Sequence, residues 1–216
     1  MRQTPTFNLL GSLPVDPEFQ RVIDLVTAHP WGQPQLARPA PLDKCSVIFY
    51  NNFSLTPLPI YRGSLGWYSD LDQALLAATM PLVEKMRDEF FPTCRPVKGE
   101  ISYLGPNIAQ GAHIDPRNFH KIAHRAHLCL TTCPGAYLTV KQERQHIQVG
   151  EVWTFNNLEP HRSLNEGEGD RVHMIIDYME ETVWQEFLDR YGEAKLYAVD
   201  QQAIAENKLI DSAGVA

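Results

Sequence analysis

Two segments in the first part of the chain carry apolar residues at helical spacing. Residues 17–29 place phenylalanine, valine and isoleucine three or four positions apart, with Asp16 before them as an N-cap and Pro30 after them as a stop. Residues 71–91 repeat the pattern behind Asp70 and include a proline, which predicts a kink. The spacing therefore predicts two helices, and the second is long enough to brace a sheet.

From residue 97 onward the helical spacing gives way to short β-branched and aromatic runs that are separated by turn residues. Six such runs without helical periodicity indicate an antiparallel sandwich or barrel of the cupin or jelly-roll kind. An earlier run at 45–52 predicts a further strand, and helical spacing returns around 183–192. The six predicted strands are 97–104, 123–132, 136–142, 144–149, 151–156 and 171–179.

With 216 residues, of which 44% are hydrophobic, the chain can bury one sizeable core. We expect one domain of mainly β structure with flanking helices. Residues 1–96 are expected to brace a jelly-roll core at 97–180, and residues 181–216 to form a helical tail. The long loop at 53–69 is expected either to cover a site as a lid or to wrap against the barrel, and we favour the wrap.

The net charge of −7 is spread along the chain, which gives no electrostatic reason to expect nucleic acid as a partner. The first residues lack an apolar run of signal-peptide length, and no stretch approaches the roughly 18 apolar residues that cross a membrane. We therefore expect a soluble, cytoplasmic protein without a membrane partner. The pattern does not predict an oligomeric state.

The four cysteines, at positions 45, 94, 129 and 133, suit buried thiols better than a disulfide scaffold, because a chain of this length does not need cross-links. Cys129 and Cys133 resemble half of a zinc knuckle. No second close pair accompanies them, so the sequence does not predict a structural zinc site there.

Three residues form a candidate metal site. His113 and Asp115 are two positions apart, so in a strand both project to one face and can reach the same ion. His161 follows Pro160, where a predicted strand stops and a ligand can be aimed into the mouth of a barrel. Two imidazoles and one carboxylate leave the opposite face of the metal open, as non-heme Fe(II) oxygenases require. Taken singly, these residues also suit a turn start and a packed histidine.

The strand that begins at Arg171 has two different faces. Alternation puts Arg171, His173, Ile175 and Asp177 on one side. The other side carries only apolar or aromatic residues, which must pack. If Arg171 is buried it needs an anion, and a bidentate carboxylate matches its planar guanidinium best. A dicarboxylic co-substrate would supply that partner. The alternative is an arginine exposed at a strand start.

A second polar face lies on the predicted strand at 123–132, where Arg125 and His127 alternate with apolar residues. These two side chains are expected either to touch the co-substrate or to form a buried network that orients the metal ligands. Ser102, on the preceding strand, is a further candidate for binding the co-substrate, with a surface serine as the alternative.

Two blocks of sequence, GAHIDPRNFHKIAHRAHLCL and GEVWTFNNLEPHRSLNEGEGDRVHMIIDY, resemble the core of a known family. This is the aspartyl/asparaginyl β-hydroxylase and proline hydroxylase family of Fe(II)/2-oxoglutarate-dependent oxygenases. The similarity covers about residues 97–178. It implies a double-stranded β-helix and a dioxygenase that uses dioxygen, converts 2-oxoglutarate to succinate and hydroxylates an unactivated C–H bond.

The resemblance also implies residue roles. The implied iron ligands are His113, Asp115 and His161. The implied 2-oxoglutarate residues are Arg171, which pairs with the distal carboxylate, together with Ser102, Arg125 and His127.

Asp115 departs from part of the family, because the peptide-modifying aspartyl/asparaginyl β-hydroxylases carry glycine at the matching position. The full triad makes the chain look more like the proline hydroxylase branch. We therefore expect a proline-, aspartate- or asparagine-like amino acid as substrate, free or in a short peptide. Loop residues able to contact it are Tyr61, Arg62, Trp67, Arg117 and Asn118.

Two other functions are compatible with the same residues. A cupin-type domain could bind or sense a carboxylate ligand without turnover. A non-oxidative metalloenzyme, such as an isomerase, could use a different divalent ion, because ligands of this kind accept several metals.

Overall fold

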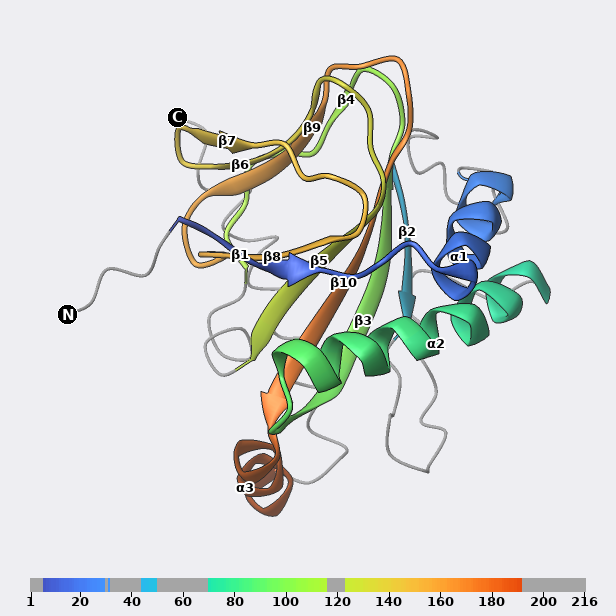
Figure 1. Cartoon of the computed structure of the whole chain (residues 1–216). Helices are drawn as coiled ribbons and strands as arrows, with labels where there is room; N and C mark the ends of the chain where they lie inside the picture. The colour runs from blue at the N-terminus through green and yellow to red at the C-terminus, as the bar shows by residue number, and fades with distance from the viewer. Residues whose placement is uncertain (1–5, 30, 32–43, 50–69, 116–122, 192–216) are drawn as a thin grey trace, which may run out of the picture.

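The computed structural model describes residues 6–29, 31, 44–49, 70–115 and 123–191. Figure 1 shows their arrangement. In chain order the elements are β1 (Phe7–Ser12), α1 (Pro17–Ala28), β2 (Lys44–Phe49), α2 (Asp70–Phe90), β3 (Cys94–Leu104), β4 (Ile108–Ala109), β5 (His124–Thr131), β6 (Ala136–Val140), β7 (Glu143–Gln145), β8 (Glu151–Phe155), β9 (His161–Asn165), β10 (Arg171–Glu180) and α3 (Glu181–Tyr191).

The strands form two antiparallel sheets. The larger has the order β1-β8-β5-β10-β3-β2, and the smaller has the order β4-β9-β6-β7. Helices α1 and α2 lie along the outer side of the larger sheet (Figure 1), and they share one apolar core with its strands. This arrangement confirms the prediction of a mainly β, jelly-roll fold with flanking helices.

The alternation predicted for β10 is confirmed. Val172, Met174, Ile176 and Tyr178 are buried in the core that the helices share with the larger sheet. The Tyr178 hydroxyl donates a hydrogen bond of 2.8 Å to the Val83 carbonyl in α2, which anchors the strand to the helix. On the opposite side of β10, Arg171, His173 and Asp177 are buried polar residues, and Ile175 is half-buried. A sheet with one apolar and one polar buried face indicates a site between the two sheets.

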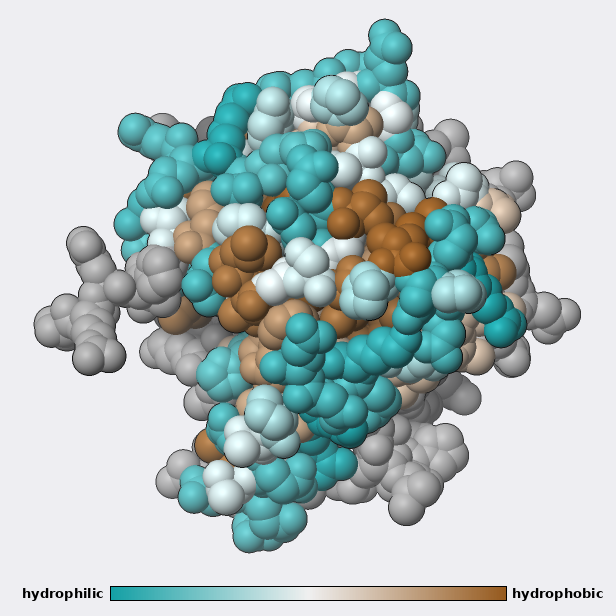
Figure 2. Space-filling model, in the orientation of Figure 1, coloured by the Kyte–Doolittle hydropathy of each residue, from teal (hydrophilic) through white to brown (hydrophobic). Residues whose placement is uncertain are grey.

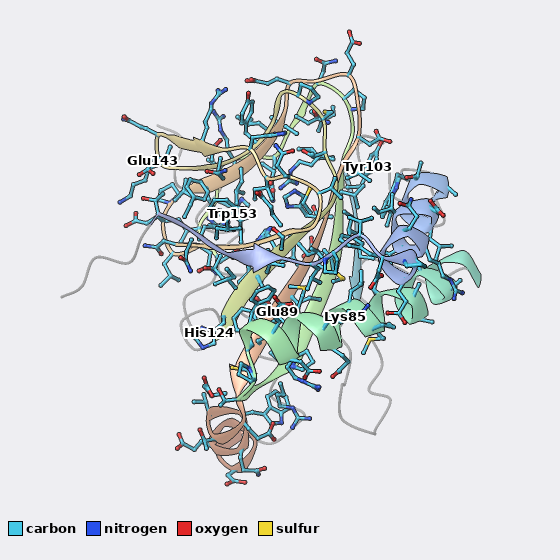
Figure 3. All side chains as sticks on the ribbon, in the orientation of Figure 1. Lys85, Glu89, Tyr103, His124, Glu143 and Trp153 are labelled. Carbon is cyan, nitrogen blue, oxygen red and sulfur yellow. The ribbon has the colours of Figure 1, made fainter. Side chains whose placement is uncertain are left out.

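Helix α1 begins as the sequence predicts. The Asp16 carboxylate accepts a hydrogen bond of 2.9 Å from the Phe19 amide, which satisfies one free N–H group of the first turn. Lys85 of α2, labelled in Figure 3, lies 2.7 Å from Asp16 and 2.7 Å from Glu18. These ion pairs join the two helices where they meet at the surface.

We expect Asp16→Asn to reveal an acid-sensitive contribution to stability. Lys85 and the Phe19 amide lower the pKa of the Asp16 carboxyl in the folded protein. A lowered pKa stabilises the fold above the unfolded value, and this stabilisation is lost as the pH falls through the folded value. The asparagine keeps an N-cap acceptor but carries no charge. The variant should therefore have a lower Tm than the wild type at neutral pH and the same Tm in acid. An equal difference in Tm at every pH would contradict this prediction.

Helix α2 presents a hydrophilic outer surface. Figure 2 shows hydrophilic residues along it and apolar surface above it on the same face. Leu75, Leu82 and Met86 of α2 are fully buried, so its apolar side faces the sheet. None of the described helices has the length and apolarity needed to cross a lipid bilayer.

The strand predictions contain two errors: one predicted strand is too long, and three strands were not predicted. The predicted strand at 144–149 ends at Gln145, because the His146 imidazole instead contacts the Ala136 carbonyl at 2.7 Å. Strands β1, β4 and β9 were not predicted. In β9 the buried positions include Ser163 and Asn165. Because these buried residues are polar, the sequence lacks the alternation of apolar and polar residues that predicts a strand. The predicted loop at 53–69 lies outside the described residues.

The described cysteines are free thiols, as expected. Cys94 and Cys129 are buried, and Cys133 is half-buried. The Cys133 thiol donates to the Asn165 side-chain oxygen at 3.2 Å and to the Gly169 carbonyl at 3.3 Å, so it belongs to a local turn network. The side chain of Cys45 lies outside the described residues.

Candidate metal centre

The two candidate histidine ligands are held together by backbone hydrogen bonds. The His113 amide donates to the His161 carbonyl at 3.0 Å, and the His161 amide donates to the His113 carbonyl at 2.9 Å. Their rings are 4.4 Å apart between centroids. His161 is the first residue of β9, so its predicted position at the start of a loop was wrong. The short bridge nevertheless places both imidazoles on one side.

Both imidazoles offer the same nitrogen to a metal. The Nδ1 atom of His113 lies 3.0 Å from the Gly111 carbonyl, and the Nδ1 atom of His161 lies 2.9 Å from the Glu159 carbonyl. A carbonyl can only accept, so we assign the ring proton to Nδ1 in each case, which leaves the Nε2 lone pair for coordination. Burial lowers the pKa of His161, which favours the neutral ring that a metal requires.

Asp115 completes the candidate donor set. Its Oδ1 atom lies 3.8 Å from the Nε2 atoms of both histidines. Its Oδ2 atom accepts hydrogen bonds from Arg125 at 2.5 Å and from Asn157 at 3.0 Å. The three ligand atoms all lie within 4.8 Å of one another. Two neutral imidazoles and one carboxylate suit Fe(II) with open positions on the opposite side, so this donor set fits the metal.

Arg125 is occupied by two carboxylates. Its Nε and Nη2 atoms donate to Asp177 at 2.8 and 2.9 Å, while Nη1 donates to Asp115. Burial alone would lower the pKa of Arg125, but the charges of Asp177 and Asp115 outweigh burial and raise it. Two alternatives were expected for Arg125: contact with the co-substrate, or a buried network that orients the metal ligands. The geometry favours the network, because Arg125 holds Asp115 directly.

Arg171 is a buried cation of a different kind. Only 2% of it is exposed, and its Nη2 atom donates to the Nδ1 atom of His173 at 3.1 Å. No carboxylate among the described residues forms an ion pair with it, and burial lowers its pKa to about 10. A buried guanidinium without an anion is unfavourable, so this position is suited to an anionic ligand.

His127 connects the two parts of the site. It is buried, and neither of its ring nitrogens has a hydrogen-bond partner in the described part of the chain. Burial and then the charges of Arg125, Arg171 and His161 lower its pKa, so the ring is neutral. Its centroid lies 6.0 Å from that of His173, the residue that accepts the hydrogen bond from Arg171. Ser102 is buried too, and it pairs with His173 in the register of β3 and β10.

One member of the network was missed by sequence reasoning. Asn157, in the turn after β8, is 8% exposed and holds Asp115 through its side-chain amide. Its neighbour Asn156 instead accepts from the Leu158 amide at 3.2 Å. Two adjacent asparagines after a strand are typical of a turn, and nothing in the sequence distinguishes the one that faces inward.

The fold and the donor set define the class: a dioxygenase that uses Fe(II), 2-oxoglutarate and dioxygen. The sequence model of the Aspartyl/Asparaginyl beta-hydroxylase family matches residues 66–181, more than half of the chain. The chain belongs to this family. Membership confirms the predicted family and the prediction of a 2-oxoglutarate-dependent dioxygenase over a domain that binds without turnover.

One solved structure supports the fold, and a second is less similar. An oxidoreductase of the 2OG-Fe(II) oxygenase family from Burkholderia pseudomallei is similar with a TM-score of 0.50 and 13% identity, over 82% of this chain and 85% of that one. A prolyl-4-hydroxylase from Pseudomonas putida has a TM-score of 0.46 and 18% identity, over 82% of this chain and 94% of its own. No curated protein matches the chain in sequence.

Proposed function

We propose that the protein hydroxylates an unactivated C–H bond of a proline-, aspartate- or asparagine-like amino acid, free or in a short peptide. His113, Asp115 and His161 would hold the iron. When bound, iron with 2-oxoglutarate and dioxygen supplies the oxidation that introduces the hydroxyl group. The observation that carries this proposal is that two imidazoles and one carboxylate converge in a fold that also buries Arg171, and that Arg171 forms no ion pair with a carboxylate of the described residues.

The proposed role of Arg171 is to bind the distal carboxylate of 2-oxoglutarate. A carboxylate can accept two parallel hydrogen bonds from one guanidinium, and it would neutralise a charge that burial otherwise penalises. Ser102 offers a hydroxyl donor on the adjacent strand. His127, whose ring nitrogens have no hydrogen-bond partner among the described residues, is proposed to contact the end of the co-substrate nearer the metal.

The proposed role of Arg125 and Asn157 is to fix the orientation of Asp115. Both donate to Oδ2, so the carboxylate cannot rotate without breaking one of two hydrogen bonds. Oδ1 therefore remains directed at the two imidazoles. Asp177 holds Arg125 in place from the opposite side through a bidentate ion pair.

The substrate proposal rests on the family and on Asp115. A carboxylate at this position gives three protein ligands, the pattern of the proline hydroxylase branch that the sequence resembles. The loop residues expected to contact the substrate, Tyr61, Arg62, Trp67, Arg117 and Asn118, lie outside the described residues. Their roles stay predictions from the sequence.

The experiment that tests the function is a substrate screen. The purified protein is incubated with Fe(II), 2-oxoglutarate and a panel of free amino acids and short peptides, and mass spectrometry then searches for products that gain one oxygen atom. We expect one member of the panel to be hydroxylated in proportion to the succinate formed. Binding of 2-oxoglutarate without succinate formation by any member would contradict the proposal.

We expect Asn157→Ala to weaken Fe(II) binding roughly 10- to 100-fold, the usual effect of losing a residue that orients a metal ligand. The variant frees one side of the Asp115 carboxylate and leaves all three ligands present. Metal titration of the purified variant measures the effect. Asn156→Ala is the matched control, because its side chain bonds to the local backbone instead. Equal Fe(II) affinity in both variants would argue against the orienting role.

A further inference from the structure

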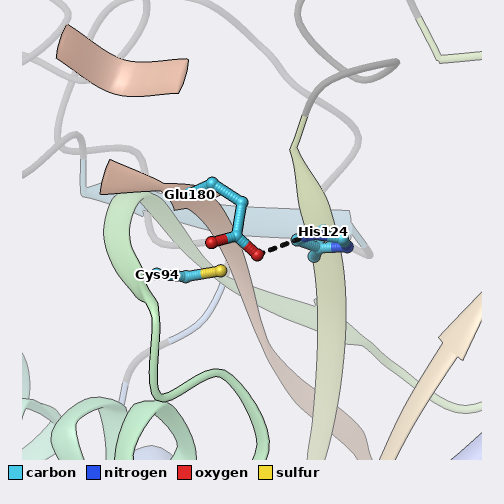
Figure 4. A group of neighbouring side chains, drawn as sticks. All are labelled: Cys94, His124 and Glu180. Atoms are coloured by element: carbon cyan, nitrogen blue, oxygen red, sulfur yellow. Dashed lines mark ion pairs between the residues drawn. The ribbon is translucent and has the colours of Figure 1, made fainter. Parts of the chain in front are cut away.

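A second group of metal-binding side chains lies at the far end of the larger sheet. Cys94 begins β3, His124 begins β5, and Glu180 ends β10, and these three strands are neighbours. Glu180 is directly paired with Cys94 in the strand register. The Cys94 sulfur, a His124 ring nitrogen and a Glu180 carboxylate oxygen lie within 4.8 Å of one another. Figure 4 shows the carboxylate between the sulfur and the ring.

This cluster is separate from the candidate iron centre. His124 and Arg125 are consecutive in β5, so their side chains point to opposite faces of the sheet. Arg125 reaches Asp115 between the sheets, while the His124 Nε2 atom lies 4.0 Å from Glu180 on the other face. In Figure 3, His124 lies low on the sheet towards α3, away from Trp153 in the barrel.

The surroundings position the three side chains. The Phe91 ring stacks on Tyr178 at 4.5 Å and on His124 at 5.9 Å between centroids, which supports one side of the imidazole. Cys94 is buried, with 7% of it exposed. Glu180 and His124 are partly open to solvent, so an ion and a water molecule could enter from that side.

We propose that Cys94, His124 and Glu180 bind a zinc ion. Zinc in proteins is usually tetrahedral and takes thiolate, imidazole and carboxylate ligands, so three side chains and one water molecule would complete the site. The sulfur is the discriminating atom, because thiolate ligands favour zinc over magnesium or calcium. The candidate iron centre offers only nitrogen and oxygen.

The charges of this site balance when the ion binds. Without a metal, burial and the hydrogen bond to Glu180 raise the pKa of the Cys94 thiol to about 11, so the sulfur keeps its proton. Hydrogen bonds from Thr93 and Cys94 lower the pKa of the Glu180 carboxyl, which is ionised at neutral pH. Zinc would displace the thiol proton into solvent and bond to the sulfur. One thiolate and one carboxylate then neutralise the divalent cation.

A bound ion would fasten three adjacent strands at one point. It would also fix the start of α3, because Glu181 follows Glu180 directly, its amide donates to the Thr93 carbonyl at 3.2 Å, and its carboxylate pairs with Arg95 at 3.1 Å. An ion that binds only the folded chain stabilises it by mass action. Zinc bound at this site would therefore stabilise the folded protein.

Cobalt(II) titration of the full-length, reduced protein tests this site, because cobalt substitutes for zinc and absorbs in the near ultraviolet only when sulfur is a ligand. We expect one sulfur-ligated cobalt per chain, displaced by zinc. Cys94→Ser should abolish the band. His113→Ala should leave it unchanged, because the candidate iron centre contains no sulfur.

Two further variants make the outcome decisive. His124→Ala changes a half-exposed side chain, so it should weaken the band without unfolding the protein. Circular dichroism checks that the variant is folded. This variant therefore tests the site even if Cys94→Ser folds poorly. Cys133→Ser removes a thiol in a separate turn and should retain the band in full. Absence of the band from the wild-type protein, or its loss in Cys133→Ser and survival in His124→Ala, would overturn the proposal.

Discussion

Arg171→Leu is expected to abolish 2-oxoglutarate binding at physiological concentrations while leaving the unliganded protein at least as stable as the wild type. Removing one partner of a buried charge pair costs about 2–5 kcal/mol of binding, or roughly one and a half to three and a half orders of magnitude in Kd. In the free protein the same guanidinium is buried, and no carboxylate of the described residues forms an ion pair with it. Burial lowers its pKa to about 10. Leucine removes that penalty and keeps an apolar stem of similar shape.

The measurement pairs calorimetric titration of 2-oxoglutarate with thermal unfolding in its presence and absence. We expect the co-substrate to raise the Tm of the wild type and leave the Tm of Arg171→Leu unchanged. Arg144→Leu is the matched control, since this arginine is half-exposed and pairs with Glu166 at the surface. If Arg171→Leu bound 2-oxoglutarate with wild-type affinity, the guanidinium would have another role.

The alternation of β10 was predictable because it depends only on backbone geometry. Successive side chains of a strand point to opposite faces whatever their partners are, so the apolar set of Val172 to Tyr178 had to pack. The same reasoning placed Arg171 on the polar face and required an anion for it if buried. The structure shows that it is buried.

The partners of the polar residues were not predictable. Arg125 contacts Asp115 and Asp177, which are separated from it by 10 and 52 positions in the chain. Strand register pairs it with Asp177, while Asp115 lies outside the strands. Alternation says which face a side chain joins, but it does not say which of several charges on that face it pairs with. The role of Arg125 therefore stayed open between two alternatives in the sequence.

The cluster of Cys94, His124 and Glu180 escaped sequence reasoning for a related reason. Metal motifs are recognised when ligands are close in sequence. Cys129 and Cys133 are the one close pair of cysteines, so only they resembled part of a zinc site. The three residues of the cluster each stand at the end of a strand, far apart along the chain. Their proximity depends on the order β5-β10-β3 in the larger sheet, which no local pattern reveals.

His113→Ala is expected to reduce 2-oxoglutarate turnover to background, because two remaining donors would not retain the iron in place. The fold should survive, since the hydrogen bonds that join this residue to His161 come from the backbone and its side chain is 30% exposed. Iron content per chain, succinate formation and circular dichroism measure the three parts of this prediction. His29→Gln, at the end of α1, is the control and should keep wild-type turnover. Wild-type succinate production by His113→Ala would show that this histidine is not an iron ligand. If His113→Ala did not fold, succinate production by His161→Ala would test the iron centre instead.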